Sequence, residues 1–190
     1  MKNFQIITLK EKNICDFAEV RNRLLKKAKS KWVLFLDTDE KISEKLRKEI
    51  EGLDPQNFSG FFIKRKIIFL GCAIGEDKVL RLARQNSGRW HRKVHETWRV
   101  RGKVGILNNY IVHNTASNLH EYIDKINKYA NMHAIENKGE GKKPTTFKII
   151  FFPIFKFIQN IILGRGFVFS MLQSFHSFLS WSQEWILLKK

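Results

Sequence analysis

The strongest chemical signal in this sequence is a group of three carboxylates, Asp37, Asp39 and Glu40, directly after the apolar stretch at 32–36. Five consecutive apolar residues predict a buried strand of a mainly parallel sheet. Residues i and i+2 of a strand point to the same face, so Asp37 and Asp39 are expected to aim at one point beyond the strand's C-terminal end. Two carboxylates there suit Mg²⁺ or Mn²⁺ that also takes phosphate oxygens. The alternative is an acidic turn into the next helix, with Asp39 or Ser43 as its N-cap.

The composition points to an anionic partner. Lys and Arg number 35 against 18 Asp and Glu, which gives a net charge of +17 over 190 residues. An excess of this size indicates nucleic acid, an acidic membrane face or phosphorylated substrates. A hydrophobic fraction of 43% excludes a disordered chain. Cys15 and Cys72 are far apart and match no ligand pattern, which favours a reduced, cytoplasmic compartment, and the first ten residues lack the apolar core of a signal peptide.

Apolar periodicity predicts an alternation of helices and strands, and therefore the α/β class. Helices are expected at 16–29, 43–51 and 117–139, with Ser43 and Ser117 as N-caps of the last two. Strands are expected at 3–9, 32–36, 58–70 and 79–83. Two further short strands, 104–107 and 110–113, are expected on either side of an Asn-Asn turn.

The last part of the chain differs in character. Residues 147–163 are apolar on nearly every side, and residues 167–188 carry an apolar stripe opposite a polar one, which predicts a pair of amphipathic helices. The longest apolar run is far shorter than the ~20 residues of a spanning helix. These helices could pack on the domain or on a partner, or lie in a membrane interface, and the basic charge favours the interface. The expected domains are residues 1–140 and 141–190.

Four motifs occur in an order that is typical of one enzyme family. They are Arg21-Asn22 in a helix, the segment Trp32–Glu40, Val94-His95-Glu96 after a basic aromatic turn, and His113 ahead of Ser117-Asn118-Leu119. With these motifs, the sequence resembles family 2 glycosyltransferases of the GT-A fold, in the bacterial branch that includes lipopolysaccharide-core β-glucosyltransferases. The resemblance covers residues 14–188 and includes the Gly-Arg-Gly at 164–166.

The resemblance implies a partial GT-A fold, with a Rossmann-like mixed sheet and flanking helices. It also implies transfer of a sugar from a nucleotide-sugar to an acceptor hydroxyl of a cell-envelope glycan or glycolipid. The family opens with a nucleotide-binding segment that residues 1–13 do not supply. A non-catalytic, membrane-associated remnant of such an enzyme is therefore an alternative to an active hexosyltransferase.

The resemblance also assigns roles to residues. Asp39 and His113 are expected to hold the divalent cation, and Asp37 to touch the ribose or a metal-bound water. Arg21 and Asn22 are expected to contact the nucleotide-sugar, and Glu96 to be the general base. Each role has a simpler alternative: His113 could be a polar residue at a strand end, and Glu96 a surface residue paired with Arg92 or Arg99.

The basic, aromatic run at 89–99 is the expected acceptor site. Arg84, Arg89 and Arg92 could hold an anionic acceptor, and His95 could orient Glu96 or hold a substrate phosphate. Trp90 or Trp98 could stack on a sugar ring, although core packing is the alternative for a tryptophan. The expected location is cytoplasmic, on the inner face of the plasma membrane. A basic nucleic-acid-binding protein is the rival explanation, but the acidic residues 37–40 would repel phosphate unless a cation intervenes.

Overall fold

The computed structural model describes residues 3–10, 14, 16–92 and 96–189. It contains eight strands and five helices within this range and divides into two units. The first unit comprises Met1–Ile67 and Glu76–Asn114, and the second comprises Ile68–Gly75 and Thr115–Lys190. The expected division near residue 140 differs from this boundary, because the helix that follows Asn118 groups with the C-terminal helices.

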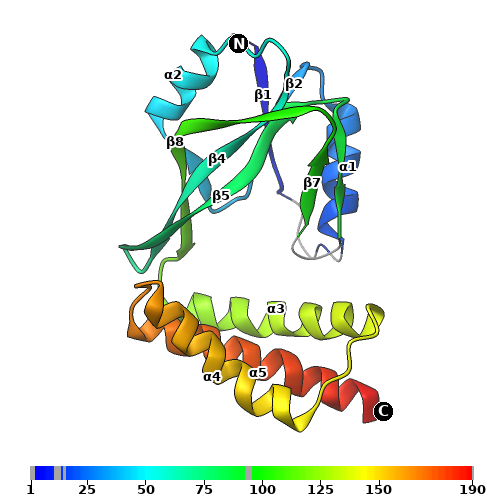
Figure 1. Ribbon diagram of the computed structural model, residues 1–190, viewed down its shortest axis with the longest axis vertical. Helices are drawn as coiled ribbons and strands as arrows, with labels where there is room; N and C mark the ends of the chain where they lie inside the picture. Colours follow the sequence, from blue (N-terminus) through cyan, green and yellow to red (C-terminus); the bar gives the residue numbers. More distant parts are fainter. Residues whose placement is uncertain (1–2, 11–13, 15, 93–95, 190) are drawn as a thin grey trace. The chain divides into compact units, whose positions relative to one another are not determined.

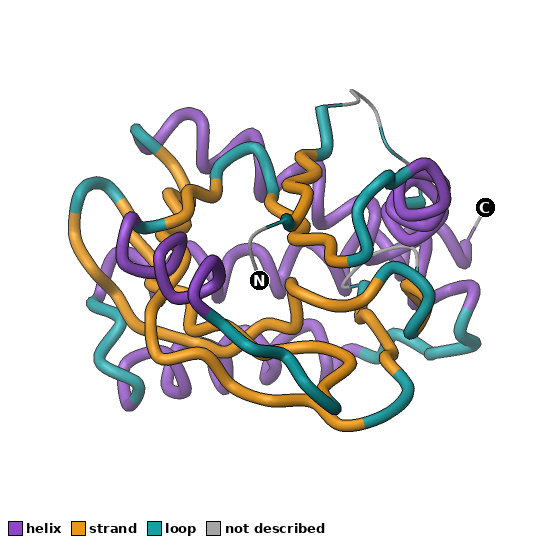
Figure 2. Tube along the Cα trace, turned by 90° about the horizontal axis from the view of Figure 1, so that it is seen from above, coloured by secondary structure: helices purple, strands orange, loops and turns teal. Residues whose placement is uncertain are grey.

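The expected α/β architecture is confirmed (Figure 1). Its main sheet has six strands in the order β1-β2-β5-β4-β8-β3, and β6 and β7 form a separate two-stranded sheet. The strands are β1 (Phe4–Thr8), β2 (Trp32–Leu36), β3 (Glu40–Ile42), β4 (Phe58–Phe69), β5 (Cys72–Arg84), β6 (Gly88–His91), β7 (Thr97–Val100) and β8 (Lys103–Ala116). The longer strands bend along their length, as the orange tube in Figure 2 shows.

The pairing of β2 corrects one expectation from the sequence. β2 is parallel to β1 but antiparallel to β5, so the sheet is mixed and not mainly parallel. Its uninterrupted apolar run reflects burial on both faces. Val33 and Phe35 join a core cluster with α1 (Phe17–Lys27), while Leu34 and Leu36 join a second cluster with α2 (Glu44–Gly52).

Two local expectations are wrong. The Asn108-Asn109 pair lies within the single strand β8, and the Glu49 carboxylate on α2 accepts hydrogen bonds from both backbone N–H groups at 2.8 and 2.9 Å. The N-cap of the third helix is Asn118, whose side chain accepts from Glu121 N, while Glu121 accepts from Ser117 N. By contrast, Ser43 caps α2 as expected, accepting from Leu46 N.

The second unit contains α3 (Leu119–Gly139), α4 (Thr146–Ile162) and α5 (Phe167–Lys189), and both α3 and α4 pack on α5. The pair of C-terminal helices is therefore confirmed as helices. Polar side chains are buried among them, namely Asn160, Ser170, Ser180 and Glu184. Among the described residues, no helix is both long and apolar enough to cross a membrane.

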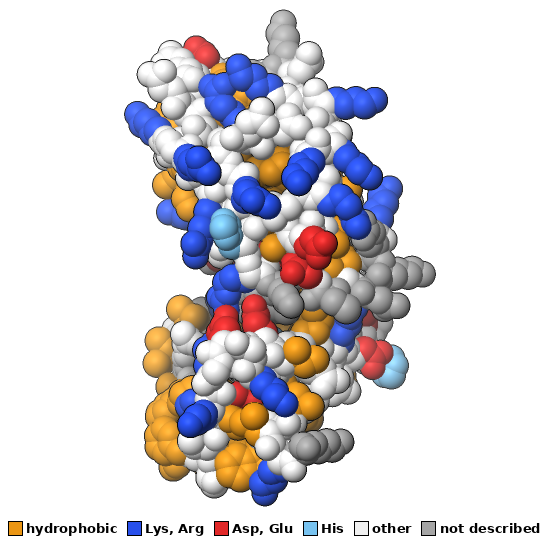
Figure 3. All heavy atoms as spheres, turned by 90° about the vertical axis from the view of Figure 1, so that its right-hand side faces the viewer, with side chains coloured by type: hydrophobic (Ala, Val, Ile, Leu, Met, Phe, Trp, Pro, Cys, Tyr) orange, Lys and Arg blue, Asp and Glu red, His pale blue; other side chains and the backbone are white. Residues whose placement is uncertain are grey.

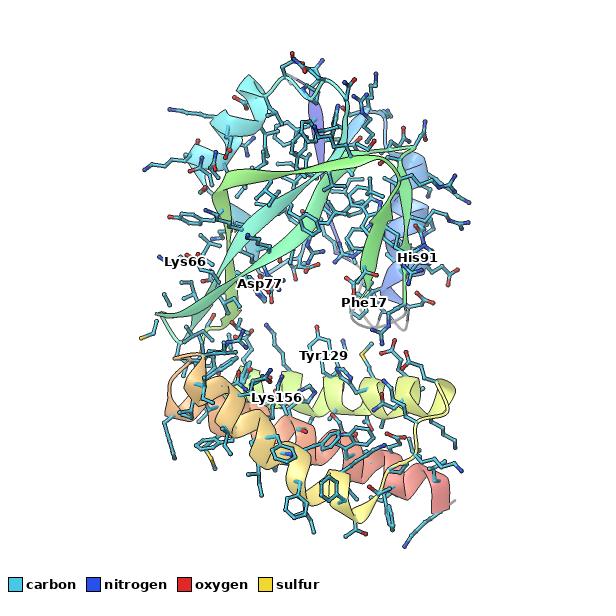
Figure 4. All side chains as sticks on the ribbon, in the orientation of Figure 1. Phe17, Lys66, Asp77, His91, Tyr129 and Lys156 are labelled. Carbon is cyan, nitrogen blue, oxygen red and sulfur yellow. The ribbon has the colours of Figure 1, made fainter. Side chains whose placement is uncertain are left out.

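The outer faces of α4 and α5 carry large apolar side chains. They include Phe147, Ile150, Phe151, Ile154, Phe155, Ile158, Ile162, Phe167, Val168, Met171, Phe175, Phe178, Ile186 and Leu188. Figure 3 shows apolar side chains gathered on the second unit, while lysines and arginines dominate the visible face of the first. Lys156, labelled in Figure 4, is half-buried on α4, and burial lowers its pKa. The second unit thus buries four polar groups beside apolar ones such as Tyr122, Ile126 and Phe169, and it exposes many large apolar side chains, which is unusual for a helical bundle in water.

Candidate functional site

The three carboxylates after β2 are held in a tight turn, which we call the acidic tip (residues 37–40). Glu40 N donates to Asp37 O at 3.1 Å, and the Glu40 carboxylate accepts from Asp37 N at 3.0 Å. Asn114 N on β8 donates to Asp39 O at 2.9 Å and ties the turn to the neighbouring strand. The backbone of the acidic tip is therefore fixed at both ends, which positions its side chains.

Arg21 joins the acidic tip to Glu96. This α1 residue is 1% exposed, and its Nη2 lies 2.5 Å from Asp37 Oδ1 and 2.8 Å from Glu96 Oε1. Its Nε also donates to Glu96 Oε1, at 2.9 Å. Glu96 therefore pairs with Arg21. A single guanidinium group links two carboxylates that are far apart in the sequence.

The pairing continues on the other side of Asp37. Arg81 Nη2 on β5 lies 2.5 Å from Asp37 Oδ2 and 3.4 Å from Glu40 Oε1. Arg65 on β4 reaches Glu40 at 3.1 Å and holds Asp77 with two hydrogen bonds, at 2.9 and 2.6 Å. Asp77 lies on β5, where Figure 4 labels it. We call this alternating series the charge chain; it consists of Glu96, Arg21, Asp37, Arg81, Glu40, Arg65 and Asp77.

The charge chain is held together by electrostatics in a largely dry environment. Burial alone would raise the pKa of the Asp37 carboxyl, but the charges of Arg81 and Arg21 outweigh it and hold the pKa below its usual range. Burial alone would lower the pKa of Arg65, but Asp77 and Glu40 raise it. The charge chain has four carboxylates and three guanidinium groups, so it keeps one negative charge in excess.

The remaining carboxylate of the acidic tip, Asp39, has a different neighbour. His113 Nε2 on β8 lies 3.3 Å from Asp39 Oδ2, and β3 and β8 pair in register at Glu40 and His113. The Asp39 side chain is 31% exposed. The Asp37 side chain is exposed to the same extent, but both of its oxygens are engaged by arginines, whereas Asp39 lies beside an imidazole.

The residues around Asp39 and His113 fit a divalent cation that takes most of its ligands from elsewhere. Among the described residues, no group of three or more His, Cys, Asp or Glu side chains is placed to hold a metal. One carboxylate oxygen and one imidazole nitrogen are adjacent here. Mg²⁺ commonly binds through one or two protein ligands, substrate phosphates and water, so this donor set is compatible with it and with Mn²⁺.

Among the residues expected to bind the acceptor and the nucleotide, some are engaged in packing and one is exposed. The Asn22 side chain exchanges two hydrogen bonds with the backbone of Trp90, each 2.9 Å, and so braces β6 against α1. Trp90 is 4% exposed, stacks on Trp98 at 5.1 Å and lies 4.5 Å from the Arg21 guanidinium, as the core-packing alternative describes. Arg89 is exposed on β6. His95 and Val94 lie outside the described residues.

Sequence reasoning missed Arg81 and Arg65 and gave Glu40 no role of its own. A signal was present for Arg81, because it stands between two leucines of a predicted strand, and arginine is rarely buried without a partner. Several buried donors nearby have no acceptor among the described residues, including Arg21 Nη1, Arg81 Nε and Trp90 Nε1. Unpaired buried donors of this kind are expected where a ligand or water binds.

Comparison with curated proteins confirms the resemblance to glycosyltransferases. The chain is 26% identical over 181 residues to the lipopolysaccharide core biosynthesis glycosyltransferase LpsC of Rhizobium meliloti, covering 86% of this chain and 67% of that protein. It is 24% identical over 157 residues to uncharacterized glycosyltransferases of Rickettsia typhi and Rickettsia prowazekii, covering 73% of this chain and 54% of each relative. The chain therefore spans between half and two thirds of the length of these relatives. No family model matches it.

Proposed function

We propose that this chain contributes the diphosphate- and acceptor-binding part of a glycosyltransferase. In this proposal, a sugar passes from a nucleotide-sugar to a hydroxyl group of a cell-envelope glycan or glycolipid. The observation that carries the proposal is that Arg21 links Glu96 directly to the acidic tip. It brings together a candidate base and candidate donor-binding carboxylates from distant parts of the sequence. The names of the relatives support the same class of reaction.

The proposed chemistry assigns a proton transfer to Glu96. Its two contacts with Arg21 both use Oε1, so Oε2 is the proposed proton acceptor. As the acceptor hydroxyl loses its proton to Oε2, its oxygen bonds to the anomeric carbon. The bond from that carbon to the diphosphate breaks, and the electron pair leaves with the diphosphate. Arg21 acts as a positioning residue because it fixes the Glu96 carboxylate relative to Asp37.

Asp39 and His113 are the proposed holders of a divalent cation. A Mg²⁺ or Mn²⁺ ion bound there would neutralise charge that develops on the leaving diphosphate. Asp37 is already paired with two arginines, so its proposed role is to shape the acidic tip and to meet the nucleotide-sugar with any remaining lone pair. Asn22 supports this arrangement indirectly by bracing β6, while exposed Arg89 is the proposed acceptor contact.

We also propose that the second unit binds the cytoplasmic face of an anionic membrane. The support is the large number of exposed apolar side chains on its helices, which on α4 include Phe151, Ile154 and Phe155. Basic side chains flank these helices, as Lys142 and Lys143 before α4 and Lys189 at the end of α5. Apolar residues with basic flanks are typical of helices that lie in a lipid interface.

The test is a transfer assay with the full chain, a set of nucleotide-sugars and a cell-envelope glycan extract, with Mn²⁺ or with a chelator. We expect Mn²⁺-dependent transfer that falls by about 100-fold or more in Glu96→Gln, since general-base catalysis contributes this much. Donor binding should change little, because glutamine keeps an acceptor for Arg21. Glu19→Gln, on the exposed face of α1, is the control. Equal rates for Glu96→Gln and wild type would refute the assignment of the base, and donor binding without transfer would favour a non-catalytic remnant.

A further inference from the structure

A second, strongly basic site lies at the other end of β2 from the acidic tip. A hollow of about 700 Å³ is lined there by Lys29, Lys31, Arg84 and Arg101, together with the polar residues of the turn at 85–87. No Asp or Glu is among its described lining residues. We call it the basic hollow. Because Lys31 precedes β2 and Asp37 follows it, the two sites are separated by roughly 20 Å, at about 3.3 Å per strand residue.

The basic hollow is built on a rigid frame. Arg84 donates from Nε to Phe58 O at 2.9 Å and from Nη2 to Gln56 O at 2.8 Å, and its guanidinium lies 5.0 Å from the Trp32 ring. The guanidinium is therefore held in place before any ligand arrives, which lowers the cost of ordering it on binding.

The turn beside Arg84 is fixed as well. Gln85 Nε2 donates to two carbonyls at the end of α1, Leu25 O at 3.1 Å and Ala28 O at 2.8 Å. Ser87 Oγ donates to Arg84 O at 2.7 Å, and Arg101 N donates to Ser87 O at 2.7 Å. Lys29, Lys31 and Arg101 are exposed around this fixed wall, so their charged ends can reach a bound anion.

We propose that the basic hollow binds a phosphoryl group carried by an anionic glycan. This inference rests on the proposed function, since the glycan would be the acceptor, held at a point remote from the reacting hydroxyl. Converging lysine and arginine side chains are the usual ligands of phosphoryl oxygens. Nucleic acid fits less well, because single strands bind by stacking bases on exposed rings. The nearby Trp32 is 4% exposed and lies beside Arg84.

The test is titration calorimetry with three probes. They are a phosphorylated oligosaccharide from a bacterial lipopolysaccharide core, the same oligosaccharide after phosphatase treatment, and a single-stranded oligodeoxynucleotide. The double variant Lys31→Ala/Arg101→Ala removes two cations of the basic hollow without touching the frame around Arg84. The matched control, Lys45→Ala/Lys48→Ala, removes the same charge from the exposed face of α2.

We expect the phosphorylated oligosaccharide to bind wild type and to lose about tenfold or more in affinity in the first double variant, because charged hydrogen bonds are lost. The control should lose less than twofold, and removal of phosphate should weaken binding to wild type as much as the double variant does. Equal losses in the two double variants, equal binding after phosphatase treatment, or no binding to wild type would each overturn the proposal. Tighter binding of the oligodeoxynucleotide through the same residues would overturn it in favour of a nucleic-acid site.

Donor binding separates this proposal from the proposed function. If the nucleotide-sugar fails to bind but the oligosaccharide titrations behave as expected, the transferase proposal fails and the proposal that the basic hollow binds a phosphoryl group stands. If donor binding is intact in both double variants but binding of the oligosaccharide does not depend on its phosphate, only the proposal about the basic hollow fails.

Discussion

Arg21 and Asp37 form a short ion pair, with Nη2 2.5 Å from Oδ1, between the first helix and the turn that follows the central apolar strand. Arg81 holds the other oxygen of the same carboxylate. Asp37 is therefore joined on both sides to guanidinium groups, whereas Asp39, which is equally exposed, lies beside His113. The two aspartates differ in their partners and not in their exposure.

Replacement of Arg21 by methionine should destabilise the fold. The substitution keeps most of the side-chain volume but removes the guanidinium that pairs with Glu96 and one of the two that hold Asp37. We expect the free energy of unfolding to fall by about 2 kcal/mol, below the usual cost of breaking a buried pair because Asp37 is partly exposed. Urea denaturation measures this change, with Lys27→Met on the exposed face of α1 as the control. An unchanged midpoint for Arg21→Met would contradict the structural role of the pair.

The stability that Asp37 contributes should depend on pH in the acid range. Its pKa is lowered in the folded state, so its contribution is fully present above the pKa of an unfolded Asp, about 3.9, and is lost as the pH falls through the lowered folded value. Wild type should therefore exceed Asp37→Asn in unfolding free energy by a constant amount above about pH 5, and the difference should shrink below about pH 4. Urea titrations at a series of pH values measure it. A difference that grows on acidification would have the wrong sign for this account.

The outer face of α4 should govern binding to lipid. The double variant Ile154→Gln/Phe155→Gln removes two exposed apolar side chains, and we expect its partitioning onto anionic vesicles to fall by about tenfold or more. Sedimentation with vesicles that contain phosphatidylglycerol measures this. The matched control is Ile106→Gln/Ile135→Gln, which removes two exposed isoleucines from β8 and α3. Equal sedimentation of the two double variants would remove the membrane role from α4.

Local signals in the sequence predicted most of the elements. The apolar run at 32–36 and the N-cap at Ser43 depend on residues close together in the sequence. The first forms strand β2, and the second begins helix α2. The Asn-Asn pair failed as a turn signal because Glu49, sixty residues away, satisfies its backbone N–H groups. The sequence also could not reveal that β2 pairs antiparallel with β5, because a strand buried on both faces has the same apolar run in a parallel and in an antiparallel sheet.

The candidate site shows the same limit. Asp37 and Asp39 were identified by spacing, but nothing in the sequence indicates that arginines from α1 and β5 hold the first while His113 from β8 lies beside the second. Asn22 was expected to contact the donor and is engaged with the backbone of Trp90, a contact that depends on how α1 packs on β6. Residue types predicted the kind of chemistry. Which of several similar residues takes which partner depends on tertiary packing, which the sequence does not show.

The most direct test of the central claim is the Mn²⁺ dependence of nucleotide-sugar binding in Asp39→Ala, measured by titration calorimetry beside wild type and the exposed control Asp54→Ala. We predict that wild type and Asp54→Ala bind the donor more tightly with Mn²⁺ than with a chelator, and that Asp39→Ala loses this difference while keeping its unfolding free energy. Unchanged Mn²⁺-dependent binding in Asp39→Ala would contradict the assignment of the acidic tip as the donor site.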